Sequence, residues 1–265
     1  MDKKVYIVYG SPCSGKNTYV KNVLNFGDLV VDMDAIYQCI GMCGMHEQPK
    51  ELVDIAFGMR DYLMDCVKKR FGKWETAYII GGFPSYAKRK QMCFELDAAD
   101  IYIKSTQEEC LHRLREHPDG RDVSRWEAYI AAWWRDYECG DETEELQTFN
   151  NMASAFYHSS KWLKTRRKYI AYRQSVDGGV CERCRNKVGY IVHHKEHLTI
   201  DNITDVNITL DDKNFELLCK ECHDKEPGHW EDRFIQLKKA IWQKQRQTSK
   251  KMDVMFDSSG QPMRK

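Results

Sequence analysis

The sequence predicts two domains: an α/β domain with a parallel sheet flanked by helices, followed by a small α+β domain built around four cysteines. In the first half, short apolar runs rich in β-favouring residues alternate with helical segments, as parallel sheets require. In the second half, two Cys-x-x-Cys pairs, Cys181/Cys184 and Cys219/Cys222, are separated by 34 residues. At 265 residues the chain is long enough for both domains.

The charge of the chain is divided unevenly. Residues 1–150 hold 19 Lys and Arg against 25 Asp and Glu, whereas residues 151–265 hold 22 against 15. The net charges of −6 and +7 make the second part the candidate for binding nucleic acid. We expect domains at 1–150 and 151–247 and a flexible tail at 248–265. The paired cysteines and the lack of an apolar N-terminal segment favour a reducing cytoplasm, and no run suits a membrane span.

A phosphate-binding loop is predicted near the N-terminus. A β-favouring run at 5–9 leads into a Gly-x-x-x-x-Gly-Lys sequence, which is followed by a helical segment at 19–26. Backbone N–H groups of such a loop and the helix N-terminus surround phosphate oxygens, and the lysine adds a positive charge. We therefore expect ATP or another nucleoside triphosphate to be bound by Gly10, Ser14, Gly15, Lys16, Asn17 and Thr18. A plain turn is the alternative.

Two positions depart from the usual magnesium-binding pattern of such loops. Asn17 follows the lysine where Ser or Thr is normal, and its Lys-x-Thr context resembles nucleoside monophosphate kinases. The segment Gly81-Gly-Phe-Pro84 resembles the Asp-Gly-Phe-Pro segment of the same kinases, with Gly81 in place of an Asp that organises magnesium. Asp34, after a predicted strand at 29–34, resembles the general base of polynucleotide-kinase-like proteins, although it could equally cap the next helix.

An arginine-bearing turn at 117–125 is placed like the small lid of these kinases. Arg121 and Arg125 are expected to close on phosphate. The alternative is that these residues are exposed arginines near helix ends. For Arg113 and Arg115, this alternative is as good an interpretation as a phosphate-binding role.

A basic helix is predicted over 151–176, directly after an acidic stretch. This segment contains no Asp or Glu, and aromatic residues are interleaved with its basic ones. A helix of this kind suits the phosphates of DNA, although a solvated basic face would look similar. The predicted DNA-binding residues are Lys161, Lys164, Arg166, Arg167, Lys168 and Arg173.

The four paired cysteines predict a structural zinc ion, because four thiolates suit tetrahedral zinc. His193 and His194 end a predicted strand, and His223 follows the second cysteine pair in a segment expected to open a helix. These three histidines are not needed by the zinc and indicate a second site. His193 and His194 are expected to point to different sides of the strand. His197 and His229 have no assigned task.

The sequence over roughly 152–230 resembles a phage-type HNH endonuclease of the ββα-metal class. The resemblance rests on 156–162, the cysteine pairs, Val-His-His and Asn-Phe-x-x-Leu-Cys-x-x-Cys-His. It implies that His193 and His223 bind a catalytic divalent metal (Mg, Mn or Ni), that His194 is the general base, and that Asn214 braces the loop orienting it. For a phage-encoded protein the compartment would be the host cytoplasm.

The leading interpretation is a metal-dependent DNA endonuclease or nickase joined to an ATP-binding, kinase-like domain, in phage DNA processing. One alternative makes the first domain a nucleotide-sensing regulator of the nuclease. The other is a zinc-stabilised DNA-binding protein without nuclease activity. A double-strand cut would need two active sites, which leaves a homo-oligomer or a phage DNA-processing partner open.

Overall fold

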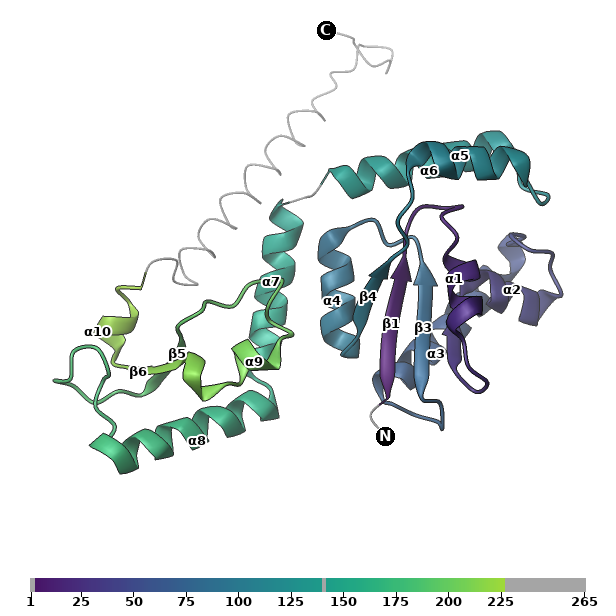
Figure 1. The fold of residues 1–265 in the computed structure, drawn as a ribbon. Coiled ribbons are helices and arrows are strands. Elements are labelled where there is room, and N and C mark those ends of the chain that lie inside the picture. The colour runs from purple at the N-terminus through teal and green to yellow at the C-terminus, as the bar shows by residue number, and fades with distance from the viewer. Residues whose placement is uncertain (1–2, 140–141, 227–265) are drawn as a thin grey trace, which may run out of the picture. The chain divides into compact units, whose positions relative to one another are not determined.

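The computed structural model describes residues 3–139 and 142–226, and they form two compact units (Figure 1). The division falls between Met1–Gly140 and Asp141–Lys265. The expected boundary at 150/151 instead falls inside the helix α7 (Glu142–Tyr157). No helix among the described residues is both long and apolar enough to cross a membrane.

The N-terminal unit is built on a parallel sheet, as the sequence predicts. Its strands are β1 (Lys4–Tyr9), β2 (Leu29–Val31), β3 (Thr76–Gly81) and β4 (Ala99–Tyr102), in the order β2-β3-β1-β4. The connection after β1 leads to β2 on one side, and the connection after β3 leads back to β4 on the other. A ligand site is expected where such connections diverge, beyond the carboxyl ends of β1 and β3.

Helices cover both faces of this sheet. The side chains of Val5, Ile7 and Ile79 pack on one face against α3 (Val53–Lys68) and α4 (Tyr86–Leu96). On the other face, Val8 and Ile80 pack against Val20 of α1 (Lys16–Val23). Adjacent residues thus face opposite sides, and burial on both faces explains why the strands are nearly all apolar.

The remaining elements of this unit lie around the ends of the strands. They are α2 (Met33–Gly41), the 3-10 turn η1 (Lys50–Leu52), α5 (Gln107–Glu116) and α6 (Val123–Glu138). Figure 1 shows α5 and α6 beyond the ends to which the strand arrows point. Thr106, which the sequence predicts as the N-cap of a helix at 106–117, caps α5 through a capping box with Glu109.

The C-terminal unit consists of helices packed beside a two-stranded antiparallel sheet. After α7 come α8 (Ser160–Asp177), β5 (Ile191–His194), α9 (Val206–Thr209), the 3-10 turn η2 (Asp212–Asn214), β6 (Phe215–Leu218) and α10 (Lys220–His223). Strand β5 pairs with β6 so that His193 lies opposite Glu216 and His194 opposite Phe215.

Three expected elements differ from the structure. The helix expected at 151–176 is two helices, because the Ser159 hydroxyl accepts a hydrogen bond from the Trp162 N–H and starts α8 anew. Residues 215–218, expected to open a helix, form β6, whose apolar side chains are buried beside β5. The helix expected at 19–26 begins at Lys16. The amphipathic, basic stretch 230–246, for which the sequence predicts a helix, lies outside the described residues, as do the tail at 248–265 and His229.

Candidate active site and metal centres

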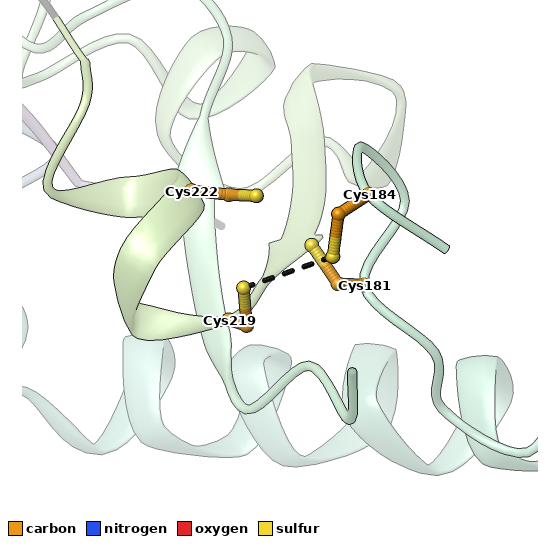
Figure 2. A group of neighbouring side chains, drawn as sticks. All are labelled: Cys181, Cys184, Cys219 and Cys222. Carbon is orange, nitrogen blue, oxygen red and sulfur yellow. Dashed lines mark hydrogen bonds between the residues drawn. The ribbon is translucent and has the colours of Figure 1, made fainter. Parts of the chain in front are cut away.

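The four paired cysteines converge on one point of the C-terminal unit, as the sequence predicts (Figure 2). Their sulfur atoms all lie within 4.8 Å of one another, and the Cys184 and Cys219 sulfurs are 3.9 Å apart. Zinc–sulfur bonds of about 2.3 Å place the sulfurs of a tetrahedral site roughly 3.8 Å apart. The cluster therefore has the donor set and the dimensions of a zinc site.

The pKa values of two thiols of this cluster are shifted in opposite directions. Burial raises the pKa of Cys181, but backbone N–H groups of Cys184, Cys219 and Arg183 outweigh it and lower the pKa to about 6. The hydrogen bond to Cys219 and burial raise the pKa of Cys222 to about 12. A bound cation would favour the thiolate at all four positions.

His193 lies in a second cluster of potential metal ligands, on the other side of β5 from the core. Its Nε2 is 3.5 Å from Glu226 Oε2, and His197 Nε2 is 3.8 Å from the same oxygen. The ligand atoms of these three residues lie within 4.8 Å of one another. The ring of His223 is 5.5 Å from that of His193. The structure thus brings the predicted pair near each other and adds two groups.

The sequence does not predict a metal-binding role for His197 or Glu226. His197 follows His193 in an irregular loop, so the spacing gives no helical signal, and Glu226 lies beyond α10. The environment suits metal binding, because burial, helped by His197 and His223, lowers the pKa of His193 to about 4. The imidazole therefore stays neutral, which is the form that binds metals.

His194 points to the opposite side of β5, into an aromatic environment. Its ring stacks on Trp162 at 4.9 Å and meets Phe215 edge-on at 5.2 Å. The Nε2 atom is 3.1 Å from the Thr209 carbonyl oxygen. Burial lowers the pKa of His194, so that the neutral ring is favoured. A neutral imidazole with one nitrogen held by a carbonyl can accept a proton at the other nitrogen.

Asn214 ties together the loop that carries the partner of His194. Its amide donates to the Ile208 carbonyl at 2.8 Å, next to Thr209, and its oxygen accepts the Glu196 N–H at 2.7 Å. The side chain therefore fixes both ends of the segment that follows β5.

A cavity of about 680 Å³ joins these groups. It is bounded by α7, α8 and β5, and both members of the His193–His194 pair line it. His197, His223 and Glu226 line it as well. The volume is within the range of ligand sites, roughly 300–1,000 Å³.

The basic residues of α8 have different environments. Lys161, Lys164, Arg167 and Lys168 are exposed. Arg166 lines the cavity and donates to the Tyr190 carbonyl at 3.1 Å. Arg173 differs from its predicted role, because it pairs with Asp177 and, at 2.7 Å, with Glu182. Asp177 lies one residue beyond the acid-free segment, so Arg173 does have compensating acids.

The predicted phosphate-binding loop connects β1 to α1. Gly15 has the left-handed conformation with φ 99° and caps α1 without a side-chain hydrogen bond. A side chain at Gly10 would lie 2.9 Å from Ser14 Oγ and 3.1 Å from the Ile103 carbonyl. Lys16 bends back over the loop and donates to the Gly10 and Ser11 carbonyls at 3.0 and 2.8 Å. Its burial lowers the lysine pKa to about 8.

Two polar groups inside this loop have no hydrogen-bond partner among the described residues. The hydroxyl oxygens of Ser11 and Ser14 are buried and have no hydrogen-bond partner within the described ranges. Buried hydroxyls without partners are costly and mark a site for an unseen group. Asn17 lies 3.5 Å from Asp32, and Thr18 is exposed in the first turn of α1.

Arginines from α5 and the turn before α6 contact the loop. Arg121, predicted to close on phosphate, places Nη1 3.2 Å from Cys13 Sγ, and its side chain is only 9% exposed. Arg113, for which an exposed position and a phosphate-binding role are equally good predictions, donates to the Ser14 carbonyl at 3.0 Å. Arg125 instead donates to the Tyr129 hydroxyl at 2.8 Å. The loop is therefore contacted by Arg113 and Arg121.

Asp34 does not cap α2, because Asp32 does so by accepting the Ala35 N–H at 3.2 Å. Both oxygens of Asp34 are engaged by a later loop, through His46 at 2.8 Å and Gln48 at 2.9 Å. Asp34 is thus one member of a side-chain network with His46 and Gln48.

The C-terminal unit has a four-cysteine cluster and a second cluster that could each hold a metal ion, with the buried His194 in the cavity beside the second. No protein-family model matches the chain. A curated relative does: the "Probable HNH endonuclease" of Lactococcus phage SK1 is 35% identical over 79 residues, which are 29% of this chain and 80% of the relative. The chain belongs to the HNH endonuclease family.

Loss of one zinc-site thiolate should abolish zinc binding. We expect the wild-type protein to contain about one zinc per chain and Cys219→Ser to contain almost none, because three thiolates leave the site open. Atomic absorption after gel filtration measures the content. Cys139→Ser, which changes an exposed cysteine of the other unit, is the control. A Cys219→Ser protein with full zinc would contradict the assignment.

Proposed function

We propose that this protein is a metal-dependent DNA endonuclease whose active site is the cavity of the C-terminal unit. The observation that carries the proposal is the placement of two adjacent histidines in one cavity but in different environments. His193 lies among metal-binding groups, whereas His194 lies among aromatic rings with one nitrogen held. Phosphodiester hydrolysis needs both environments, one for charge stabilisation and one for activating water.

The catalytic metal would be held by His193 and His223, with His197 and Glu226 as further ligands. Two or three imidazoles and a carboxylate suit Mn²⁺ or Ni²⁺, and Mg²⁺ would rely more on Glu226. When bound, the ion supplies positive charge to the phosphate oxygens. Arg183 pairs with Glu226 and keeps this carboxylate beside His193.

His194 would accept the proton of the attacking water. Holding Nε2 at the Thr209 carbonyl directs Nδ1 to this task. Asn214 would keep that carbonyl in place through Ile208. Both histidine roles need neutral rings, which burial favours.

DNA would approach along α8, and the four-cysteine zinc would hold the scaffold. The exposed positive charges of this helix can contact phosphates without sequence preference. Arg166 would reach the phosphate nearest the cavity, whereas Arg173 would serve the fold. The proposed DNA contacts are Lys161, Lys164, Arg166, Arg167 and Lys168.

The plasmid-nicking activity should depend on His194. We expect nicking of supercoiled plasmid with Mg²⁺, Mn²⁺ or Ni²⁺, and a loss of about 10²-fold or more in His194→Ala, because general-base catalysis contributes that much. Zinc content should not change. His112→Ala, which alters a histidine with a 70% exposed side chain, is the matched control. Intact plasmid under every metal would favour a DNA-binding protein without nuclease activity.

Metal binding should distinguish the proposed ligands. We expect Glu226→Gln and His193→Ala each to weaken Mn²⁺ binding in calorimetry at least tenfold, because each removes a donor from a cluster spanning 4.8 Å. Glu196→Gln, an exposed glutamate on the loop after β5, is the control for Glu226→Gln. Unchanged Mn²⁺ affinity in Glu226→Gln would assign the site to the histidines alone.

We also propose that the N-terminal unit binds ATP or another nucleoside triphosphate. The buried hydroxyls of Ser11 and Ser14 and the folded-back Lys16 favour an anionic ligand at this loop. Arg113 and Arg121 would add positive charge. Phosphoryl transfer is the activity that such a site supports, and regulation of the nuclease by nucleotide is the alternative.

ATP binding should depend on Lys16. We expect Lys16→Ala to weaken binding of a fluorescent ATP analogue at least tenfold, because the lysine supplies the mobile charge inside the loop. Lys21→Ala, at the exposed end of the same helix, should bind normally. Equal binding by all three proteins, or no binding by the wild type, would remove the nucleotide site from the proposal.

A further inference from the structure

A histidine–carboxylate pair lies in the N-terminal unit, outside the nuclease site. His46 Nδ1 is 2.8 Å from Asp34 Oδ2, with side chains only 16% and 20% exposed. The other carboxylate oxygen accepts a hydrogen bond from the Gln48 amide at 2.9 Å. The pair forms because the segment between α2 and η1 returns to the start of α2.

The pair is linked to the phosphate-binding loop from two directions. Asp34 lies two residues after Asp32, whose carboxylate is 3.5 Å from the Asn17 amide. The His46 ring meets Trp126 edge-on at 5.3 Å. The guanidinium of Arg121, which reaches Cys13 in the loop, lies 5.3 Å from the centre of the same Trp126 ring.

The backbone also indicates that the position of His46 is enforced. Its φ is 68°, a left-handed conformation that is uncommon for residues with a side chain. Such conformations persist where the surroundings determine them, and they gather at functional sites. Gln48 already ties the same segment to the same carboxylate, so attachment of the loop does not by itself require an imidazole.

The chemistry of the pair favours proton transfer. A carboxylate that accepts the Nδ1–H of a histidine fixes its tautomer, leaves Nε2 free to accept a proton, and stabilises the charge that then forms. Both oxygens of Asp34 are already engaged, which makes Asp34 itself a poorer direct base. The proton-accepting role expected for Asp34 therefore passes to His46.

We propose that His46, oriented by Asp34, is the general base for phosphoryl transfer from a nucleoside triphosphate to a hydroxyl group. In this step the acceptor oxygen bonds to the γ-phosphorus and the bond to the β–γ bridging oxygen breaks, releasing the diphosphate. The hydroxyl proton passes to His46 Nε2 and then to water. The inference rests on the proposed nucleotide site.

The pair also selects between two classes of acceptor. A hydroxyl must lose a proton as it attacks, so a base accelerates its reaction. A nucleoside monophosphate offers an ionised phosphate oxygen, which has no proton to lose. A dedicated histidine–carboxylate pair therefore suits a hydroxyl and has no task with a phosphate acceptor.

The test measures label transfer from γ-labelled ATP to a 5′-hydroxyl oligodeoxynucleotide and, separately, to deoxynucleoside monophosphates. We expect the full-length protein to label the oligonucleotide, and His46→Ala to label it about 10²-fold more slowly or less. Added imidazole should restore part of the rate in His46→Ala but not in Asp34→Asn. His112→Ala, which alters an exposed histidine of the same unit, should act as the wild type.

Binding of the fluorescent ATP analogue tests the nucleotide site separately from the role of His46. If the wild type fails to bind it, the nucleotide site itself is wrong. If binding is intact, three outcomes overturn the role of His46: no labelling of the oligonucleotide, labelling of monophosphates alone, or wild-type rates in His46→Ala. An inactive His46→Ala that binds ATP but is not rescued by imidazole would also overturn it, because a merely structural histidine predicts that result.

Discussion

The pairing of β5 with β6 is the constraint on which the C-terminal site depends. Because successive side chains of a strand face opposite sides, His193 and His194 enter different environments although they are neighbours in sequence. A shift of register by one residue would exchange them and place the neutral, stacked ring among the potential metal ligands. The cysteine cluster holds β6 from two positions, since Cys219 directly follows β6 and the Glu182 N–H, next to Cys181, donates to the Leu217 carbonyl at 2.9 Å.

Arg183 extends this constraint from the thiol cluster to the second cluster. It lies between Cys181 and Cys184, and donates two bonds of 2.8 and 3.0 Å to Glu216 Oε2, opposite His193 on β6. A further nitrogen pairs with Glu226. A planar guanidinium holds two carboxylates in fixed directions better than an ammonium would. A zinc ion bound by the four cysteines would therefore also fix the ligand geometry around the proposed catalytic ion.

The sequence predicts those parts of the protein whose chemistry is local. The parallel sheet and the four-thiol cluster follow from composition and spacing, and both are present. The β6 strand is missed because four residues are too few to separate strand from helix. The sequence misses the roles proposed for His197, Glu226 and His46 for another reason. Each of these residues meets its partners only when a loop folds back, and the spacing of residues in the sequence does not show such contacts. Arg113 belongs with them, since its contact with Ser14 spans 99 residues.

The two histidines proposed as bases differ in what holds them. His194 is held by a neutral carbonyl in an apolar pocket, which disfavours a lasting positive charge and suits brief acceptance of a proton next to a cation. His46 is held by a carboxylate near the positive charges of Lys16 and Arg121, and the carboxylate offsets them when the ring accepts a proton. The hydrogen-bond partner of each histidine thus suits the charges around it. The metal proposed beside His194 would make a second anion there unnecessary, whereas His46 has Asp34 for this purpose.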